Sequence, residues 1–179
     1  MRVRQSGAAL LVCLLLLVPL LMLSLSAMET SLLGEQMASG VEDQNRAFQS
    51  AEAALEAAEL WIAEQEELPQ ASAEAGGQVW VEGVLSSASE GALWWNSGSL
   101  DLSWWRLNGT AIVTDPSLAE SAHYIIEQYR FVRDGESIEL GSGKQRSQVA
   151  YHRVTALGVG RRSSSRVLLQ STYVRTFDE

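Results

Sequence analysis

The side chains that could perform chemistry are few and lie far apart in the sequence. The two histidines, His123 and His152, fall in segments predicted to be strands, and neither has a cysteine, a histidine or a carboxylate at the spacing of a metal site. Residues 141–145 read GSGKQ, which lacks the upstream glycine and the Ser or Thr of a phosphate-binding loop. No Gly-x-Ser-x-Gly motif is present. We therefore expect no catalytic site, no metal and no cofactor, and the sequence does not predict an enzyme.

Tryptophan is the most unusual residue in the chain. Four of its six tryptophans form two adjacent pairs, Trp94 with Trp95 and Trp104 with Trp105. The only cysteine, Cys13, lies in an apolar stretch, so no disulfide can form within the remainder of the chain. We interpret the tryptophans as filling the core between a helix and a sheet. The alternative is an exposed aromatic patch that binds a partner subunit, an adhesin or a surface glycan.

Any such residues must be positioned by a domain that follows a long apolar stretch. Residues 8–28 include 21 residues without a charge. As a helix they would span roughly 31 Å, close to the ~30 Å hydrocarbon core of a bilayer. Arg2 and Arg4 precede the stretch, so the basic end is expected in the cytoplasm and the rest of the chain on the other side.

The helix is predicted to continue beyond the apolar stretch. Apolar or small residues recur at helical spacing from Leu33 to Ile62, and Leu68–Pro69 provides a stop. This pattern predicts one helix from residue 8 to about residue 67, with a transmembrane part at 8–28 and an amphipathic part at 29–68. Pro19 removes one backbone donor, so a kink or local melting of the turn at residues 15–19 is expected.

Residues 69–179 are predicted to form an α+β domain. Segments rich in β-branched and aromatic residues predict strands at 78–85, 124–133, 148–157 and 166–177. Gly135, residues 141–143 and residues 158–165 are expected to separate the last three strands. Val167, Leu169, Tyr173 and Phe177 share one face of the last strand, and we expect the amphipathic half of the helix to cover it.

The charge of the chain excludes one class of partner and suggests another. The net charge is −9, which disfavours nucleic acid. Acidic residues are concentrated in residues 29–67, whereas residues 123–179 carry an excess of basic ones. This asymmetry could favour contacts between the head of one subunit and the stalk of a neighbour, although a solvated charged face is the simpler interpretation.

Both ends of the chain resemble the type IV pilins, and within them the minor pilins of the PilX type. The similarity lies in Gly7 followed by AALLV at 8–12, in residues 36–40 and 45–55, and in YHRVTALGVG at 151–160 with VLLQSTY at 167–173. The resemblance implies a prepilin with a basic leader at 1–7, cleavage after Gly7 by a prepilin peptidase, and methylation of Ala8. It also implies a long helix on a mainly antiparallel head, and extraction from the membrane into a filament through that helix.

One position departs from the pattern of the family. Most type IV pilins have a glutamate at the fifth mature position, where this chain has Val12. Subunits similar to the tip pseudopilin of type II secretion share such a departure. The resemblance therefore implies a minor pilin at or near the pilus tip, which primes assembly and supports twitching motility and adhesion. Its implied partners are the membrane, other minor pilins, the major pilin and a large tip adhesin.

The implied location is the inner membrane of a Gram-negative bacterium, in a single pass with the head in the periplasm, and later the pilus fibre at the cell surface. Two other hypotheses fit the residues. The chain could be a permanent single-pass scaffold of another envelope complex. It could also be a secreted binding protein, because Ser24-Leu25-Ser26 fits a signal-peptide site with cleavage before Ala27.

Overall fold

The computed structural model describes residues 8–74, 77–85, 94–96, 101–113, 115–133 and 147–178. The chain divides into two compact units, Met1–Glu42 and Asp43–Glu179, and we call the second unit the head. Helix α1 (Ala8–Glu64) contributes to both units. Gly7, residues 141–143 and Gly135 lie outside the described residues, so the predicted leader cleavage and turns at these positions remain predictions.

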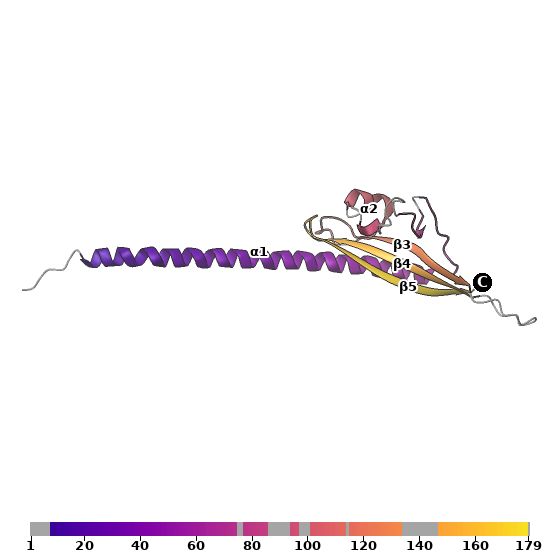
Figure 1. Cartoon of the computed structure of the whole chain (residues 1–179), viewed down its shortest axis with the longest axis horizontal. Helices are drawn as coiled ribbons and strands as arrows, with labels where there is room; N and C mark the ends of the chain where they lie inside the picture. The colour runs from indigo at the N-terminus through magenta and orange to yellow at the C-terminus, as the bar shows by residue number, and fades with distance from the viewer. Residues whose placement is uncertain are drawn as a thin grey trace, which may run out of the picture. The chain divides into compact units, whose positions relative to one another are not determined.

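Helix α1 is continuous over 57 residues (Figure 1). It runs through Pro19 without a break, so the expected local melting at residues 15–19 does not occur, while a kink there stays a prediction. The helix ends three residues earlier than expected. At this end the side-chain amide of Gln65 donates to the carbonyl of Trp61 at 3.0 Å, which satisfies one of the free carbonyls of the last turn.

The head contains a five-stranded, mostly antiparallel sheet, which confirms the α+β prediction. Its three long strands are β3 (His123–Arg133), β4 (Ser147–Val159) and β5 (Arg166–Asp178), and each pairs antiparallel with the next. Short strands β1 (Val79–Val81) and β2 (Thr110–Ala111) both pair with β3, β1 in parallel and β2 antiparallel. The predicted strand at 78–85 is therefore too long, because Gly83 adopts a positive φ of 81° in a turn directly after β1.

The second half of α1 covers one face of the sheet, as predicted. Alternate residues of the strands face the helix, and their register places them together in one core. Small side chains dominate the helix side of this core. The buried residues of the whole core are Ala54, Ala58, Ile62, Val79, Ala122, Tyr124, Ile126, Val154 and Ala156. Small residues allow the helix and the sheet to approach closely.

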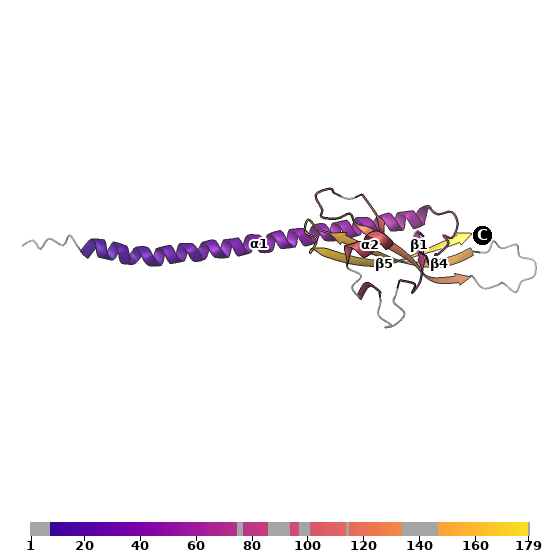
Figure 2. The same cartoon turned by 90° about the horizontal axis from the view of Figure 1, so that it is seen from above.

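The opposite face of the sheet has a core of its own. The short helices η1 (Trp94–Asn96) and α2 (Leu102–Asn108) cover it (Figure 2). The buried members of this core are Trp80, Trp94, Trp105, Ile125, Leu157 and Val159. The paired tryptophans therefore fill a core between helix and sheet, and the helices concerned are η1 and α2. Helix α1 covers the other face.

Candidate functional site

The helix of the first unit presents apolar side chains from Leu10 to Met28. Every large apolar side chain from Leu10 to Met28 is more than half exposed within the chain, and the segment has a mean hydropathy of 2.7 over its most apolar window. Two hydroxyls of this helix are satisfied within it, because Ser24 donates to the carbonyl of Leu20 at 2.8 Å and Thr30 to that of Ser26 at 3.0 Å. A helix of this kind is long and apolar enough to cross a membrane.

The residues singled out at the start of this helix lie on that exposed surface. Ala8 is the first residue of α1, and Val12 follows one turn later with a side chain that is 54% exposed. Cys13 is free and exposed. Thus an apolar side chain occupies the position where the resemblance implies a carboxylate.

At Gly158 the sheet lies directly against the backbone of α1. A Cβ atom at this position would lie 2.1 Å from the carbonyl oxygen of Ala47 and 2.4 Å from the amide nitrogen of Ala51. These neighbours belong to the backbone, so they cannot turn aside as a flexible side chain could. Gly158 lies within β4 and does not begin the turn, so its expected role as a strand separator was wrong. Its absence of a side chain lets strand and helix touch.

Asp43 joins α1 to the turn between β4 and β5. Its carboxylate is buried and accepts hydrogen bonds from the backbone amides of Arg161 at 2.6 Å and Arg162 at 3.3 Å. A hydrogen bond from the Ser165 hydroxyl, followed by these amides, holds the pKa of Asp43 below its usual value. In the sequence, Asp43 is one of many acidic residues between positions 29 and 67. Its position one turn before Ala47, a buried alanine of α1, was the available signal, but its partners are more than 100 residues away.

The tryptophan cluster is tied to the sheet by one buried carboxylate. Trp94 stacks on Trp104 with ring centroids 5.1 Å apart, and its Nε1 donates to Oε2 of Glu127 at 3.0 Å. Trp94 and Trp105 are buried, whereas Trp95 and Trp104 are half-buried. The four tryptophans named from the sequence therefore come together, and only two of them reach the surface.

Arg153 extends this cluster outward. Its guanidinium lies 3.8 Å from Glu127 and 3.7 Å from Glu82, and its Cζ lies 4.4 Å from the ring centroid of Tyr129. Burial raises the pKa of Glu127, although the hydrogen bond from Trp94 and the charge of Arg153 oppose this. The guanidinium thus fills the space beside the rings, and the arrangement serves to hold the tryptophans on the sheet.

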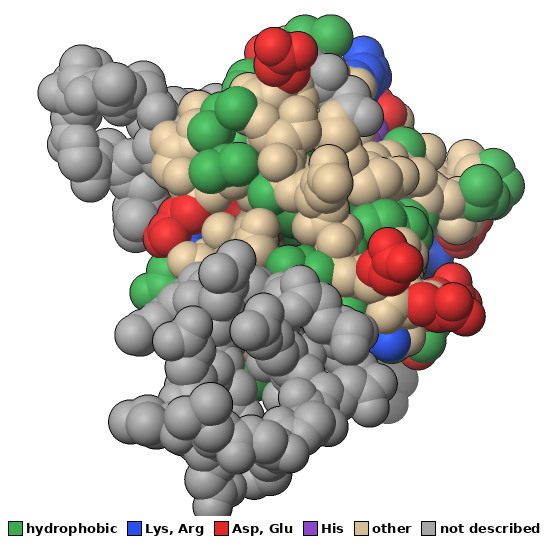
Figure 3. All heavy atoms as spheres, turned by 90° about the vertical axis from the view of Figure 1, so that its right-hand side faces the viewer, with side chains coloured by type: hydrophobic (Ala, Val, Ile, Leu, Met, Phe, Trp, Pro, Cys, Tyr) green, Lys and Arg blue, Asp and Glu red, His purple; other side chains and the backbone are tan. Residues whose placement is uncertain are grey.

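Both histidines are buried in the head. His152 is fully buried, with Phe177 as an edge-to-face neighbour at 6.5 Å, and neither of its ring nitrogens has a hydrogen-bond partner there. Burial lowers the pKa of both His152 and His123. No group of three metal-ligating side chains occurs among the described residues. Over the face of the head shown in Figure 3, acidic side chains lie at several separate places among apolar and polar ones.

Two protein-family descriptions match the chain and together cover most of it. The description "PilX N-terminal" matches residues 6–56, and "Type IV pilus assembly protein PilX C-term" matches residues 63–175. The chain belongs to the PilX family. Comparisons with curated proteins and with solved structures found no significant match. PilX proteins are structural components of type IV pilus assembly and not a known enzyme family, so this PilX-family chain is a minor pilin of that system.

Membership of the PilX family fits both units of the chain. The N-terminal match contains the exposed apolar stretch, which is what a membrane-anchored pilus component requires. The C-terminal match contains Gly158 and the sheet apart from the last three residues of β5. A PilX protein also implies contacts with other pilus components.

Proposed function

We propose that this minor pilin is a low-abundance subunit at or near the pilus tip, where it helps to prime assembly. The observation that carries the proposal is the continuous helix α1, which exposes an apolar surface from Leu10 to Met28 and has Val12 one turn from its start. An exposed apolar helix gains free energy only in lipid or against other apolar helices. A subunit without an acidic side chain at residue 12 lacks the group that would pair with a subunit above it.

In this proposal the chain interacts with several partners in succession. A prepilin peptidase removes residues 1–7 after Gly7, and Ala8 becomes the methylated N-terminus. The precursor crosses the inner membrane of a Gram-negative bacterium once, with its head in the periplasm. The helix then leaves the bilayer for the filament, where other minor pilins, the major pilin and a large tip adhesin are its neighbours. Twitching motility and adhesion follow from the assembled pilus.

The mature N-terminus separates this proposal from its alternatives. Mass spectrometry of the chain from sheared pili and from membranes should give a start at Ala8. A start at Ala27 would indicate a secreted protein, and an intact Met1 in a chain that never enters pili would indicate a permanent envelope scaffold. Gly7→Leu should leave the leader in place and reduce surface pili, whereas Gln5→Ala in the same leader should be processed normally.

The position in the pilus needs a separate measurement. Gold-labelled antibodies against the head should mark the ends of sheared pili and leave their shafts unlabelled. Regular labelling along the shaft would contradict a tip position, although it would still be compatible with a pilin.

A further inference from the structure

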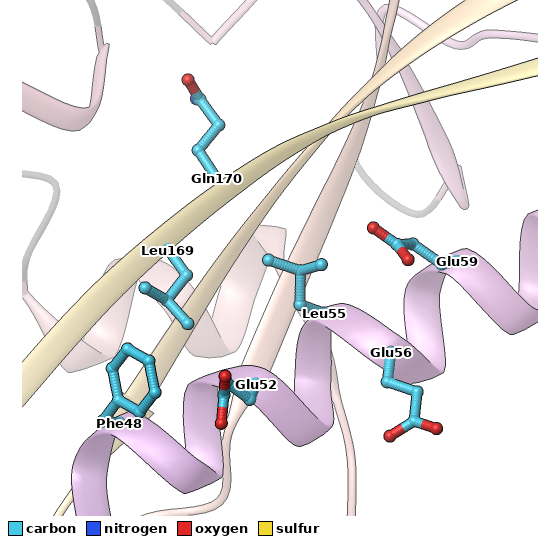
Figure 4. Close-up of a pocket in the computed structure, with 7 residues that line it drawn as sticks. All are labelled: Phe48, Glu52, Leu55, Glu56, Glu59, Leu169 and Gln170. Atoms are coloured by element: carbon cyan, nitrogen blue, oxygen red, sulfur yellow. The ribbon is translucent and has the colours of Figure 1, made fainter. Parts of the chain in front are cut away.

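A groove in the head runs between α1 and β5 (Figure 4). Its volume is about 560 Å³. Phe48 and Leu55 of the helix and Leu169 of the strand give it an apolar lining, and Leu169 points toward Phe48. Phe48 is 42% exposed although it lies beside the core. In this position the aromatic ring exposes apolar surface to water, and a bound partner would cover that surface.

The helix side of the groove is negatively charged. Glu52 and Glu56 lie one turn apart and are exposed, and Glu59 follows on the same side. Glu59 is attached to the strand, because its Oε1 accepts a hydrogen bond from the Ser171 hydroxyl at 2.7 Å. Among the described residues, no cation lies within ion-pair distance of Glu52 or Glu56. The two carboxylates are therefore available to a partner with positive charge.

The strand side of the groove is a sheet edge. Among the described strands, β5 pairs with β4 alone, and all 13 of its residues take part in that pairing. An edge strand leaves a row of backbone donors and acceptors that an extended segment of another chain can bind. The sheet edge is independent of the carboxylates. It indicates that a partner would be extended, whereas the carboxylates indicate that a partner would be positively charged.

We propose that this groove receives an extended, arginine- or lysine-bearing segment from the head of a neighbouring pilin. The segment lies along β5, places an apolar side chain against Phe48 and Leu169, and pairs its cations with Glu52 and Glu56. The present chain shows that a head of this kind can expose such cations, because its β4–β5 turn exposes Arg161 and Arg162. This inference rests on the proposed function, because it requires that the head meets other pilins.

Photo-crosslinking in cells tests the contact. Gln170 lines the groove from β5 and its side chain points away from α1, so Gln170→Cys can carry benzophenone-maleimide without filling the groove. The variant is made in a full-length Cys13→Ser background, which removes the only native cysteine. Leu107→Cys on α2, 78% exposed, is the matched control outside the groove. We expect irradiation to join residue 170, but not residue 107, to a basic segment of another pilin.

Charge neutralisation then tests the carboxylates. Glu52→Gln with Glu56→Gln should lower the crosslinking yield, by up to about fivefold for each exposed ion pair lost. Glu64→Gln with Glu67→Gln removes two exposed charges outside the groove and should leave the yield unchanged. Equal yields from both double variants, adducts only to proteins that are not pilins, or no adduct at residue 170 would each overturn the inference.

The same cells separate this inference from the proposed function. If the parent chain is present in sheared pili but residue 170 forms no pilin adduct, the groove is not an assembly contact and the minor-pilin role stands. If the chain is absent from pili and from their membrane-bound precursors, the proposed function itself fails.

Discussion

Replacing Gly158 with alanine should disrupt the packing of the sheet against α1 and destabilise the head. The new Cβ would lie 2.1 Å from the Ala47 carbonyl oxygen, whereas a carbon–oxygen contact of this kind is comfortable near 3.5 Å. The strand and the helix would have to separate by more than about 1 Å, and both obstructing atoms of Ala47 and Ala51 belong to a regular helix.

The magnitude follows from the kind of neighbour. Overpacking in a core costs typically 1–3 kcal/mol, and we expect about 3 kcal/mol here because backbone atoms cannot move out of the way. For a domain of the size of the head, this free-energy change should lower Tm by about 10 °C. Gly40→Ala is the matched control, because a Cβ there meets nothing within 4 Å and the residue lies outside the head.

Tryptophan fluorescence can follow the unfolding of the full-length chain in detergent. All six tryptophans lie between residues 61 and 105, within the head, so the signal reports on the head alone. Gly40→Ala should unfold at the parent temperature. A Gly158→Ala variant that unfolds within about 2 °C of the parent would refute the argument, because it would mean that helix and strand can separate without loss of packing.

Three further predictions concern the opposite face and the buried charges. Changing Trp94 and Trp95 together to alanine should unfold the head, since a buried tryptophan alone costs about 3–5 kcal/mol and Glu127 would lose its donor; a stable head that loses only partner binding would instead place these rings in an interface. Burial lowers the pKa of His152, so the unfolded chain takes up a proton at a higher pH than the folded chain, and the stability of the head should fall as the pH drops below about 6.5. His152→Leu should flatten this decline in melting curves recorded between pH 7 and 5. An unchanged slope would contradict a buried neutral imidazole. The pKa of Asp43 is lowered, so its contribution is present above the unfolded value of about 3.8 and is lost on further acidification; Asp43→Asn should lower Tm at pH 7 and differ less from the parent at pH 3, and equal differences at both pH values would show that the charge plays no part.

The long elements were predictable because their signals are local. Alternating β-branched and aromatic residues predicted the three long strands to within two residues at each end, and strong helix formers predicted α1. The face of β5 that α1 covers was also predictable, because the strand period of two fixes which side chains point together.

The contacts that hold the head together were not predictable, because each depends on a distant residue. The sequence around Gly158 is typical of a turn. Glycine is required there because the backbone of Ala47, which is distant in the sequence, lies against it. Asp43 meets amides that follow it by more than 100 residues. The tryptophan pairs lie in short, irregular segments without a period, so their sequence could indicate burial but not which face of the sheet they cover.

The two cores explain how a head without a disulfide can be stable while it packs against the second half of a helix whose first half is apolar enough to cross a membrane. On the helix face, alanines and Gly158 bring backbones together, and packing at such short range depends on shape and not on the size of the side chains. The remaining apolar area that a small domain needs lies on the other face, in the tryptophans. Asp43 adds a link at the first residue of the head, and by binding the amides of Arg161 and Arg162 it also fixes where those exposed cations stand. A change at Asp43 should therefore alter both the attachment of α1 and the presentation of the basic turn to a neighbouring pilin.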